Sequence, residues 1–309
     1  MTIDSARASQ SSECYVCRST RVRPFADHEE FTHVVCEDCR LVRLDNSQIV
    51  PTTEIYTPAY FSGKLFEETS GRLGYAKSYV DPLKSHRAQQ YGQYADELAA
   101  ELRRYDRRPL RVLDFGCSYG AFLTTLQERM EDDVEVHGVE VNAEVCKKAS
   151  SRLNGAPVHC VDLKIDRGEV PQSYFEAITL LDVIEHLDDP RAYLERLAEC
   201  ARPDGLLLIS TPNIESFNAR LYGTRWILHT PPYHISYFGP RSIEVLLRET
   251  GWTVVRWRTE RTIFHNERSG RETWRGRTFR ALFQNRLFDM LTNRALRIGS
   301  IMTVMAKRS

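Results

Sequence analysis

Residues 110–122 read LRVLDFGCSYGAF: a short apolar run, a turn rich in small residues, and the start of a helical pattern that continues to residue 130. Small residues at Gly116, Ser118 and Gly120 let the backbone turn sharply and approach a ligand closely. In open α/β sheets such a turn lies at the carboxyl edge of a strand, where these folds bind their ligands. The stretch therefore predicts a strand, a ligand-binding turn and a helix.

Further strands are expected on the carboxyl side of this turn, because short apolar runs alternate there with helical patterns. The runs occupy residues 134–141, 156–161, 175–184 and 205–211. This alternation is typical of a doubly wound parallel sheet, so the predicted fold class is α/β and Rossmann-like. Ahead of the turn, apolar positions from about Ser85 onward recur every three to four residues and predict one long helix.

Two acidic residues restrict the ligand of the turn. Glu140 ends the second strand, 20 residues after Gly120, where a carboxylate can accept both hydroxyls of a ribose. Asp114 precedes Gly116 in the first strand, where it would oppose a pyrophosphate but suit a cationic amino group. The glycines also follow GxxxG spacing and not the GxGxxG spacing of dinucleotide sites. These features limit the ligand to a nucleoside-type cofactor and favour S-adenosylmethionine over a dinucleotide.

The stretch VLDFGCSYGAF at residues 112–122 resembles motif I of the class I S-adenosylmethionine-dependent methyltransferases, with Ser118 replacing a frequent middle glycine. LLDVIEHLDDP and PDGLLLISTPN are similar to later motifs of that superfamily. The resemblance covers about residues 75–260 and implies a seven-stranded sheet whose last strand, residues 301–309, is antiparallel to residues 253–260. It assigns these residues to the cofactor: Asp114, Gly116 and Gly120 to the methionine part, Glu140 to the ribose, Asp162 beside the adenine, and Asp182 at the end of the fourth strand.

Four of the eight cysteines form two CxxC pairs separated by 18 residues. These cysteines are Cys14, Cys17, Cys36 and Cys39. Each such turn presents two sulfurs to one edge of a tetrahedron, so the pattern predicts a small ribbon around a structural zinc ion. A closed site of four thiolates leaves no open position for catalysis. Arg18 and Arg40 stand where such knuckles often carry glycine, and four unligated buried cysteines are the alternative.

A more particular resemblance includes the zinc pairs, the segment YTPAYF at residues 56–61 and the run at residues 212–252. Together with the core they resemble bacterial methyltransferases of polysaccharide and natural-product (antibiotic) gene clusters, including relatives that methylate nucleotide-linked deoxysugars. Those larger sugar enzymes have an additional C-terminal domain, which we do not expect here. The resemblance implies a small-molecule substrate, such as a nucleotide-linked or lipid-linked sugar. Tyr56, Tyr60 and Phe61 are candidates to cover the cofactor.

Two histidines fall in segments expected at the carboxyl edge of the sheet. His234, in the loop TPPYHISYF, is the preferred general base, and His186, in DVIEHL, is the second candidate. A different hypothesis uses Asp182, Glu185 and His186 to bind a divalent ion that orients the substrate. The adjacent glutamate and histidine resemble the pair of the ubiquinone-pathway O-methyltransferases.

The chain is expected to contain three parts. They are a zinc ribbon with a disordered start at residues 1–50, a helical connecting segment at 51–109, and a methyltransferase domain at 110–309 with a basic helical insertion at about 262–300. Lys plus Arg and Asp plus Glu both number 42, but the segment 256–309 has 13 basic against 4 acidic residues. Its ordinary interpretation is an insertion packed between the last two strands, and contact with an anionic substrate, a partner or a membrane surface is the alternative.

Two other functions remain open beside small-molecule methylation. A nucleic-acid methyltransferase would use the ribbon and the Arg-rich tail to hold RNA, but DVIEHL lacks the Pro-Pro-aromatic motif associated with base-amine methylation. A non-catalytic module would keep only the cofactor site. No apolar stretch is long enough for a membrane span and the start carries no apolar leader, so a cytoplasmic location is expected.

Overall fold

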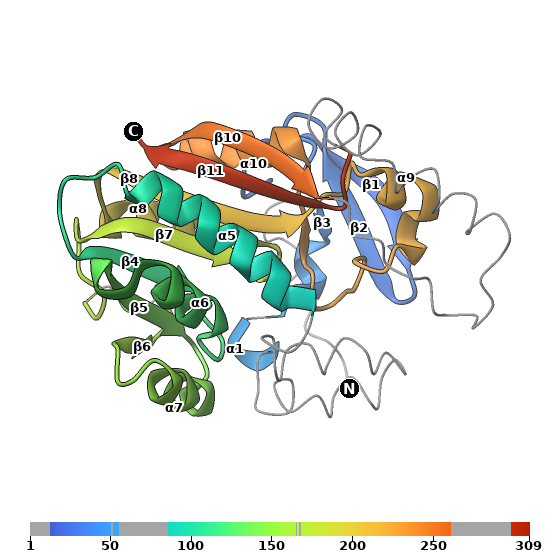
Figure 1. Ribbon diagram of the computed structural model, residues 1–309. Coiled ribbons are helices and arrows are strands. Elements are labelled where there is room, and N and C mark those ends of the chain that lie inside the picture. Colours follow the sequence, from blue (N-terminus) through green and yellow to red (C-terminus); the bar gives the residue numbers. More distant parts are fainter. Residues whose placement is uncertain (1–12, 51, 56–85, 165, 167, 261–297) are drawn as a thin grey trace, which may run out of the picture.

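A mixed seven-stranded sheet forms the centre of the molecule (Figure 1). The computed structural model describes residues 13–50, 52–55, 86–164, 166, 168–260 and 298–309. The strands of this sheet are β4 (Leu110–Phe115), β5 (Val134–Glu140), β6 (Val158–Cys160), β7 (Phe175–Leu181), β8 (Ala201–Pro212), β10 (Trp252–Glu260) and β11 (Ile301–Arg308). Their order is β10-β11-β8-β7-β4-β5-β6, and β11 is antiparallel to both neighbours. The predicted Rossmann-like sheet and its antiparallel last strand are confirmed.

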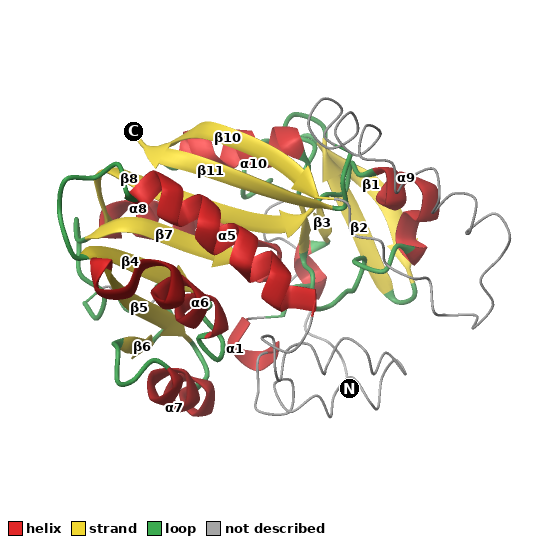
Figure 2. Cartoon of the chain, in the orientation of Figure 1, coloured by secondary structure: helices red, strands yellow, loops and turns green. Residues whose placement is uncertain are grey.

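Helices cover both faces of the sheet (Figure 2). They are α5 (His86–Leu102), α6 (Ala121–Met130) and α7 (Ala143–Arg152) on one face, and α8 (Pro190–Cys200) and α10 (Pro240–Glu249) on the other. Strand β4 shows why two cores form: Leu110 and Val112 pack with the first group of helices, while Leu113 and Phe115 pack with the second. Successive side chains of a strand point to opposite faces, so an uninterrupted apolar run predicts a strand buried on both sides.

The cysteine pairs lie in a second, four-stranded antiparallel sheet. Its strands are β1 (Val22–His28), β2 (Phe31–Cys36), β3 (Val42–Leu44) and β9 (Ser236–Tyr237), in that order. Strand β9 comes from the loop that carries His234, so the ribbon is not built from residues 1–50 alone. Two residues are too short to show a period of two, which is why the sequence pattern did not indicate this strand.

Short elements complete the described chain. They are α1 (Thr52–Ile55), α9 (Phe217–Tyr222), and the 3-10 turns η2 (Asn46–Gln48), η4 (Glu131–Asp133), η5 (Ile184–His186) and η6 (Gly223–Arg225). Among the helices of the described residues, none is long and apolar enough to cross a membrane. The candidate cofactor cover at Tyr56, Tyr60 and Phe61, and the basic insertion up to residue 297, lie outside the described residues.

Candidate active site

The glycine turn between β4 and α6 has the backbone geometry that the sequence predicts. Gly116 and Gly120 have φ angles of +76° and +73°, in the region that favours glycine. A Cβ atom on Gly116 would lie 2.7 Å from Cγ2 of Val183, so a side chain would collide with the loop after β7. Ser118, where the related motif often has glycine, also has a positive φ of 48°. The turn therefore exposes its backbone to the pocket described below.

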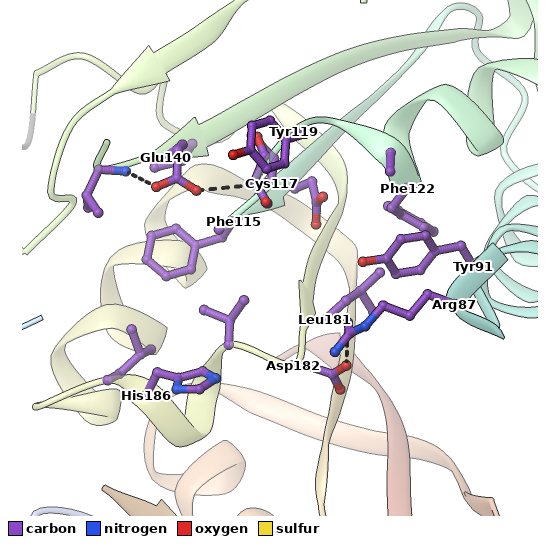
Figure 3. A pocket seen from close by; sticks show the side chains of 18 of the residues that line it. Arg87, Tyr91, Phe115, Cys117, Tyr119, Phe122, Glu140, Leu181, Asp182 and His186 are labelled. Atoms are coloured by element: carbon purple, nitrogen blue, oxygen red, sulfur yellow. Dashed lines mark hydrogen bonds and ion pairs between the residues drawn. The ribbon is translucent and has the colours of Figure 1, made fainter. Parts of the chain in front are cut away.

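Glu140 lies at the end of β5 beside this turn (Figure 3). One of its carboxylate oxygens accepts a hydrogen bond of 3.2 Å from the backbone N–H of Ser118. The other accepts from the N–H groups of Val141 and Asn142, at 2.9 and 3.1 Å. Burial raises the pKa of Glu140, and these three N–H groups oppose the shift. The carboxylate is thus held in one orientation, as an acceptor for a diol should be.

Asp114 is buried in β4 and its Oδ1 accepts a 2.6 Å hydrogen bond from the Thr179 hydroxyl. Burial raises its pKa to about 7, the hydrogen bond from Thr179 opposes this, and the Glu140 carboxylate adds to it. Both acids, Asp114 and Glu140, lie in the buried wall of one pocket. A ligand that brings a positive charge to this wall would restore the ordinary ionisation of Asp114. The residues present therefore fit an ammonium group.

An ion pair closes another side of the pocket. Arg87, in the first turn of α5, donates from Nη1 to Oδ2 of Asp182 at 3.0 Å, and the two side chains face each other in Figure 3. The Ser210 hydroxyl donates to Oδ1 of the same aspartate at 2.9 Å. Asp182 has a φ of +56°, which costs a non-glycine residue energy and is found where the surroundings impose it. Sequence reasoning missed Arg87, because an arginine in a helical pattern ordinarily indicates the solvent face.

The glycine turn, the two acids and the ion pair surround one pocket. The pocket and its open mouth enclose about 1050 Å³ of space, open solvent included. The described residues of its wall include Arg87, Tyr91, Asp114, Phe115, Gly116, Ser118, Tyr119, Phe122, Glu140, Asp182, Val183, His186 and Tyr193. Tyr91 of α5 is a further wall residue, a position that the helical pattern does not indicate.

Asp162 lies behind this wall. Its Oδ1 accepts hydrogen bonds from the Tyr193 hydroxyl at 2.8 Å and from the Lys164 N–H at 2.9 Å. The ring of Tyr193 lines the pocket, while Asp162 is not among the wall residues. The structure thus places Asp162 in contact with a residue of the pocket wall, Tyr193. Its direct contact with the cofactor stays a prediction.

The two candidate histidines are in contact with each other. Their rings meet edge to face with centroids 4.7 Å apart, and of the two only His186 is part of the pocket wall. His186 Nδ1 lies 2.8 Å from the carbonyl oxygen of Tyr233, and His234 Nδ1 lies 2.7 Å from that of Leu228. A carbonyl oxygen only accepts, so each Nδ1 carries the proton and Nε2 is the basic nitrogen.

Burial keeps both imidazoles neutral. It lowers the pKa of His186 to about 4 and that of His234 well below its usual range, and the second shift is increased by His186. Glu185, next to them, has a pKa raised by burial and accepts a 2.9 Å hydrogen bond from the Thr211 hydroxyl. A neutral imidazole beside a pocket is a proton acceptor, which is the chemistry required of a general base.

The same cluster has the composition of a metal site. One ligand atom each from Glu185, His186 and His234 lie within 4.8 Å of one another. The sequence hypothesis had grouped Asp182 with Glu185 and His186, whereas in the structure Asp182 pairs with Arg87. A divalent ion at this cluster therefore stays a hypothesis, with His234 in the place of Asp182.

The four ribbon cysteines converge as the CxxC spacing predicts. Cys14 Sγ lies 3.5 Å from Cys39 Sγ, and Cys17 Sγ lies 3.5 Å from Cys36 Sγ. All four sulfurs lie within 4.8 Å of one another, a donor set suited to tetrahedral zinc. The positions after each pair have left-handed backbone, which explains why related knuckles often carry glycine there. They are Arg18, with φ +61°, and Arg40, with φ +66°.

A doubly wound sheet with a glycine turn after one strand and a fixed acid after the next defines an α/β protein that binds a nucleoside-type cofactor. Residues 84–256 match the family model described as a methyltransferase domain. This match covers more than half of the chain, and the protein belongs to that family.

Two relatives have similar sequences over part of their length. An uncharacterized methyltransferase of Mycobacterium bovis is 30% identical over 117 residues, which are 38% of this chain and 58% of that protein. The ubiquinone biosynthesis O-methyltransferase of Mesorhizobium japonicum is 24% identical over 185 residues, covering 56% of this chain and 74% of the relative. The match to the mycobacterial relative thus spans little more than half of its length.

Two solved structures share the fold. The carbon methyltransferase CurJ aligns with a TM-score of 0.52 and 13% identity over 84% of this chain and 66% of its own. The [4+2]-cyclase SpnF gives the same score and identity over 84% of this chain and 97% of its own. Since one is a methyltransferase and the other a cyclase, the likeness establishes the fold and leaves the reaction to the site.

Proposed function

We propose that the protein transfers a methyl group from S-adenosylmethionine to a small molecule, a sugar or natural-product intermediate. The observation that carries the proposal is the single pocket in which the glycine turn, Glu140 and Asp114 face His186. A nucleoside site and a neutral basic side chain share this pocket, as methyl transfer to a protonated nucleophile requires.

Different residues of the pocket wall would bind different parts of the cofactor. Glu140 would accept the ribose hydroxyls, Asp114 would face the ammonium group, and Arg87 would attract the methionine carboxylate while Asp182 fixes the guanidinium. Bound there, S-adenosylmethionine supplies an electrophilic methyl group to a nucleophile held in line. The residues of this chain would bind the cofactor, orient the acceptor and exclude water from the pocket.

The histidine pair would remove the proton of the acceptor. His186 is part of the pocket wall, whereas His234 contacts the His186 ring and is not a wall residue. We therefore favour His186 as the group that meets the acceptor. His234, the base preferred from the sequence, would then act by packing against the His186 ring, because each Nδ1 donates to a backbone carbonyl oxygen and the two rings meet edge to face. A divalent ion at Glu185, His186 and His234 is the competing mechanism, because the same atoms would be its ligands.

The charge distribution supports an anionic acceptor. The segment 256–309 has an excess of nine basic residues in a chain of zero net charge, and phosphate groups of a nucleotide-linked or lipid-linked sugar carry the opposite sign. We also propose that this segment contacts a membrane surface or a partner, and that the protein is located in the cytoplasm. The four cysteines would hold a structural zinc ion that completes the ribbon.

Calorimetry with S-adenosylmethionine and S-adenosylhomocysteine tests the cofactor step, followed by assays of labelled methyl transfer to a panel of nucleotide-linked sugars. Binding of both ligands and transfer to a sugar are expected. Binding without transfer to any small molecule would favour the non-catalytic module, and RNA binding that weakens steeply with salt would favour the nucleic-acid alternative. Absence of binding to either ligand would refute all of these.

A further inference from the structure

The loop that carries His234 is held by the ribbon. Its residues Ser236 and Tyr237 form β9 and pair with Arg43 and Val42 of β3. Beyond the pair, the backbone N–H of Leu44 donates to the carbonyl oxygen of Ile235 at 2.9 Å. A segment more than 180 residues away in the sequence thus becomes the edge strand of the cysteine-bearing sheet.

The opposite side of the same loop holds the histidine pair. The N–H of Ile235 donates to the carbonyl oxygen of Glu185 at 3.0 Å, so Ile235 joins the ribbon to η5 through its two backbone groups. His186 Nδ1 donates to the carbonyl oxygen of Tyr233. The orientation of the His186 ring is therefore set by residues 233–235, whose own position is set by β3.

The first cysteine knuckle fixes the ribbon against this loop and against the large sheet. Tyr15 lies between Cys14 and Cys17, and its hydroxyl is hydrogen-bonded to the Ser236 hydroxyl of β9. Arg191 of α8 donates from Nε to the carbonyl oxygen of Tyr15 and from Nη2 to the carbonyl oxygen of Val16. A third donation, at 3.3 Å, reaches the carbonyl oxygen of Glu249 at the end of α10.

We propose that the ribbon positions the part of the active site that receives the acceptor. Through Tyr15 and Arg191 the ribbon holds residues 233–235 in place, and these residues orient the imidazole of His186. Tyr15 and Arg191 are positioning residues and touch neither substrate nor cofactor. The catalytic role of this coupling rests on the proposed function, but the coupling itself is a property of the folded chain.

The coupling distinguishes the ribbon from a passive scaffold. Loss of a scaffold would loosen the cofactor turn and the acceptor loop together. Loss of a positioning contact would loosen residues 233–237 and 184–186, while the turn at 116–120, which bonds instead to β5, keeps its order. Thiolates gathered around a metal would stiffen the knuckle that carries Tyr15.

Hydrogen–deuterium exchange on the full, metal-loaded chain tests the proposal with Tyr15→Phe. The variant keeps the ring and removes only the hydroxyl contact to Ser236. Exchange of the Ile235 and Leu44 amides is expected to rise about fivefold, the effect of one hydrogen bond of ordinary net strength. Tyr105→Phe is the matched control, because its hydroxyl makes one hydrogen bond, to the Asp204 carbonyl oxygen, away from the ribbon.

Arg191→Gln is the stronger variant, and Arg248→Gln, on the exposed surface of α10, is its control. Faster exchange at 233–237 with unchanged exchange at 116–120 and unchanged affinity for S-adenosylhomocysteine supports the coupling. Unchanged exchange at Ile235 in both variants overturns it, and so does an equal rise at the glycine turn. Failure of S-adenosylhomocysteine to bind the unaltered protein would refute the proposed function alone, since the exchange comparison does not depend on that ligand.

Discussion

At the scale of single residues, the cofactor wall depends on a few side chains whose positions are fixed by backbone hydrogen bonds. Three N–H groups orient the Glu140 carboxylate, and one hydroxyl orients Asp114. Because such groups are already held in place before a ligand arrives, little ordering cost accompanies binding. Substitutions at these residues should therefore change cofactor affinity more than they change the fold.

Glu140→Gln provides the sharpest residue-level test of the cofactor site. The amide keeps the size of the side chain, but one of its two acceptor positions becomes a donor, so one ribose hydroxyl loses a charged partner. We expect affinity for S-adenosylhomocysteine to fall by about 2 kcal/mol, roughly 30-fold, in calorimetry. Glu144→Gln, an exposed residue of α7, should leave affinity unchanged. Equal affinities of the two variants would remove Glu140 from the ribose contact.

His186→Asn and His234→Asn separate the roles of the two histidines. Loss of the general base should lower kcat by about 10² to 10⁴ while cofactor affinity is retained. We expect the larger loss for His186, because it forms part of the wall and His234 lies behind it. Measurement of kcat and of cofactor affinity for both variants decides the order. A larger effect at His234 would restore it as the direct base.

At the scale of elements, the ribbon hairpin and the loop after η6 meet through a group of neighbouring imidazole rings. The His229 ring lies 4.5 Å from that of His33 on β2 and 5.2 Å from that of His28 on β1, and it stacks on Tyr237 of β9 at 4.6 Å. Burial, with smaller contributions from His33 and His28, lowers the pKa of His229 from 6.5 to about 3. The folded chain therefore favours the neutral form of the His229 ring.

Acid should therefore destabilise the ribbon contact. Below pH 6.5 the unfolded chain binds a proton at His229 that the folded chain does not, so the free energy of unfolding falls as pH falls, down to about pH 3. Between pH 6.5 and pH 5 this residue alone costs about 2 kcal/mol. Urea unfolding at the two pH values should show that loss in the unaltered protein and a smaller one in His229→Gln. Identical pH dependence of the two proteins would contradict the prediction.

The elements also show what the sequence could and could not predict. Strands β4, β5, β7 and β8 were predictable because each contains a mostly apolar run buried on both faces, and the cysteine spacing alone indicated the ribbon. Strand β9 gave no pattern because it has two residues. Arg87 was missed for a related reason: its burial comes from Asp182, which is 95 residues away in sequence, and helical periodicity records no such partner.

At the scale of the whole molecule, two clusters among the described residues could hold metal ions, and they differ in chemistry. The four thiols of the ribbon form a closed set that suits zinc, whereas Glu185, His186 and His234 offer one carboxylate and two imidazoles beside the pocket. An ion at the first cluster would stabilise the fold, and an ion at the second would take part in the reaction. A single experiment on the intact chain can separate them, because ions bound by closed thiolate sites resist mild chelation.

Elemental analysis of the purified protein should find about one zinc per chain. Dialysis against EDTA under reducing conditions should leave that zinc bound and the ribbon folded, while it removes an ion held beside the open pocket. If His186 acts as a base without metal, methyl transfer is retained after this treatment. If transfer is lost and returns with Mg²⁺ or Mn²⁺, the carboxylate and the imidazoles are metal ligands and the base mechanism is wrong. Zinc contents near zero in a Cys14→Ser variant would place the retained ion in the ribbon.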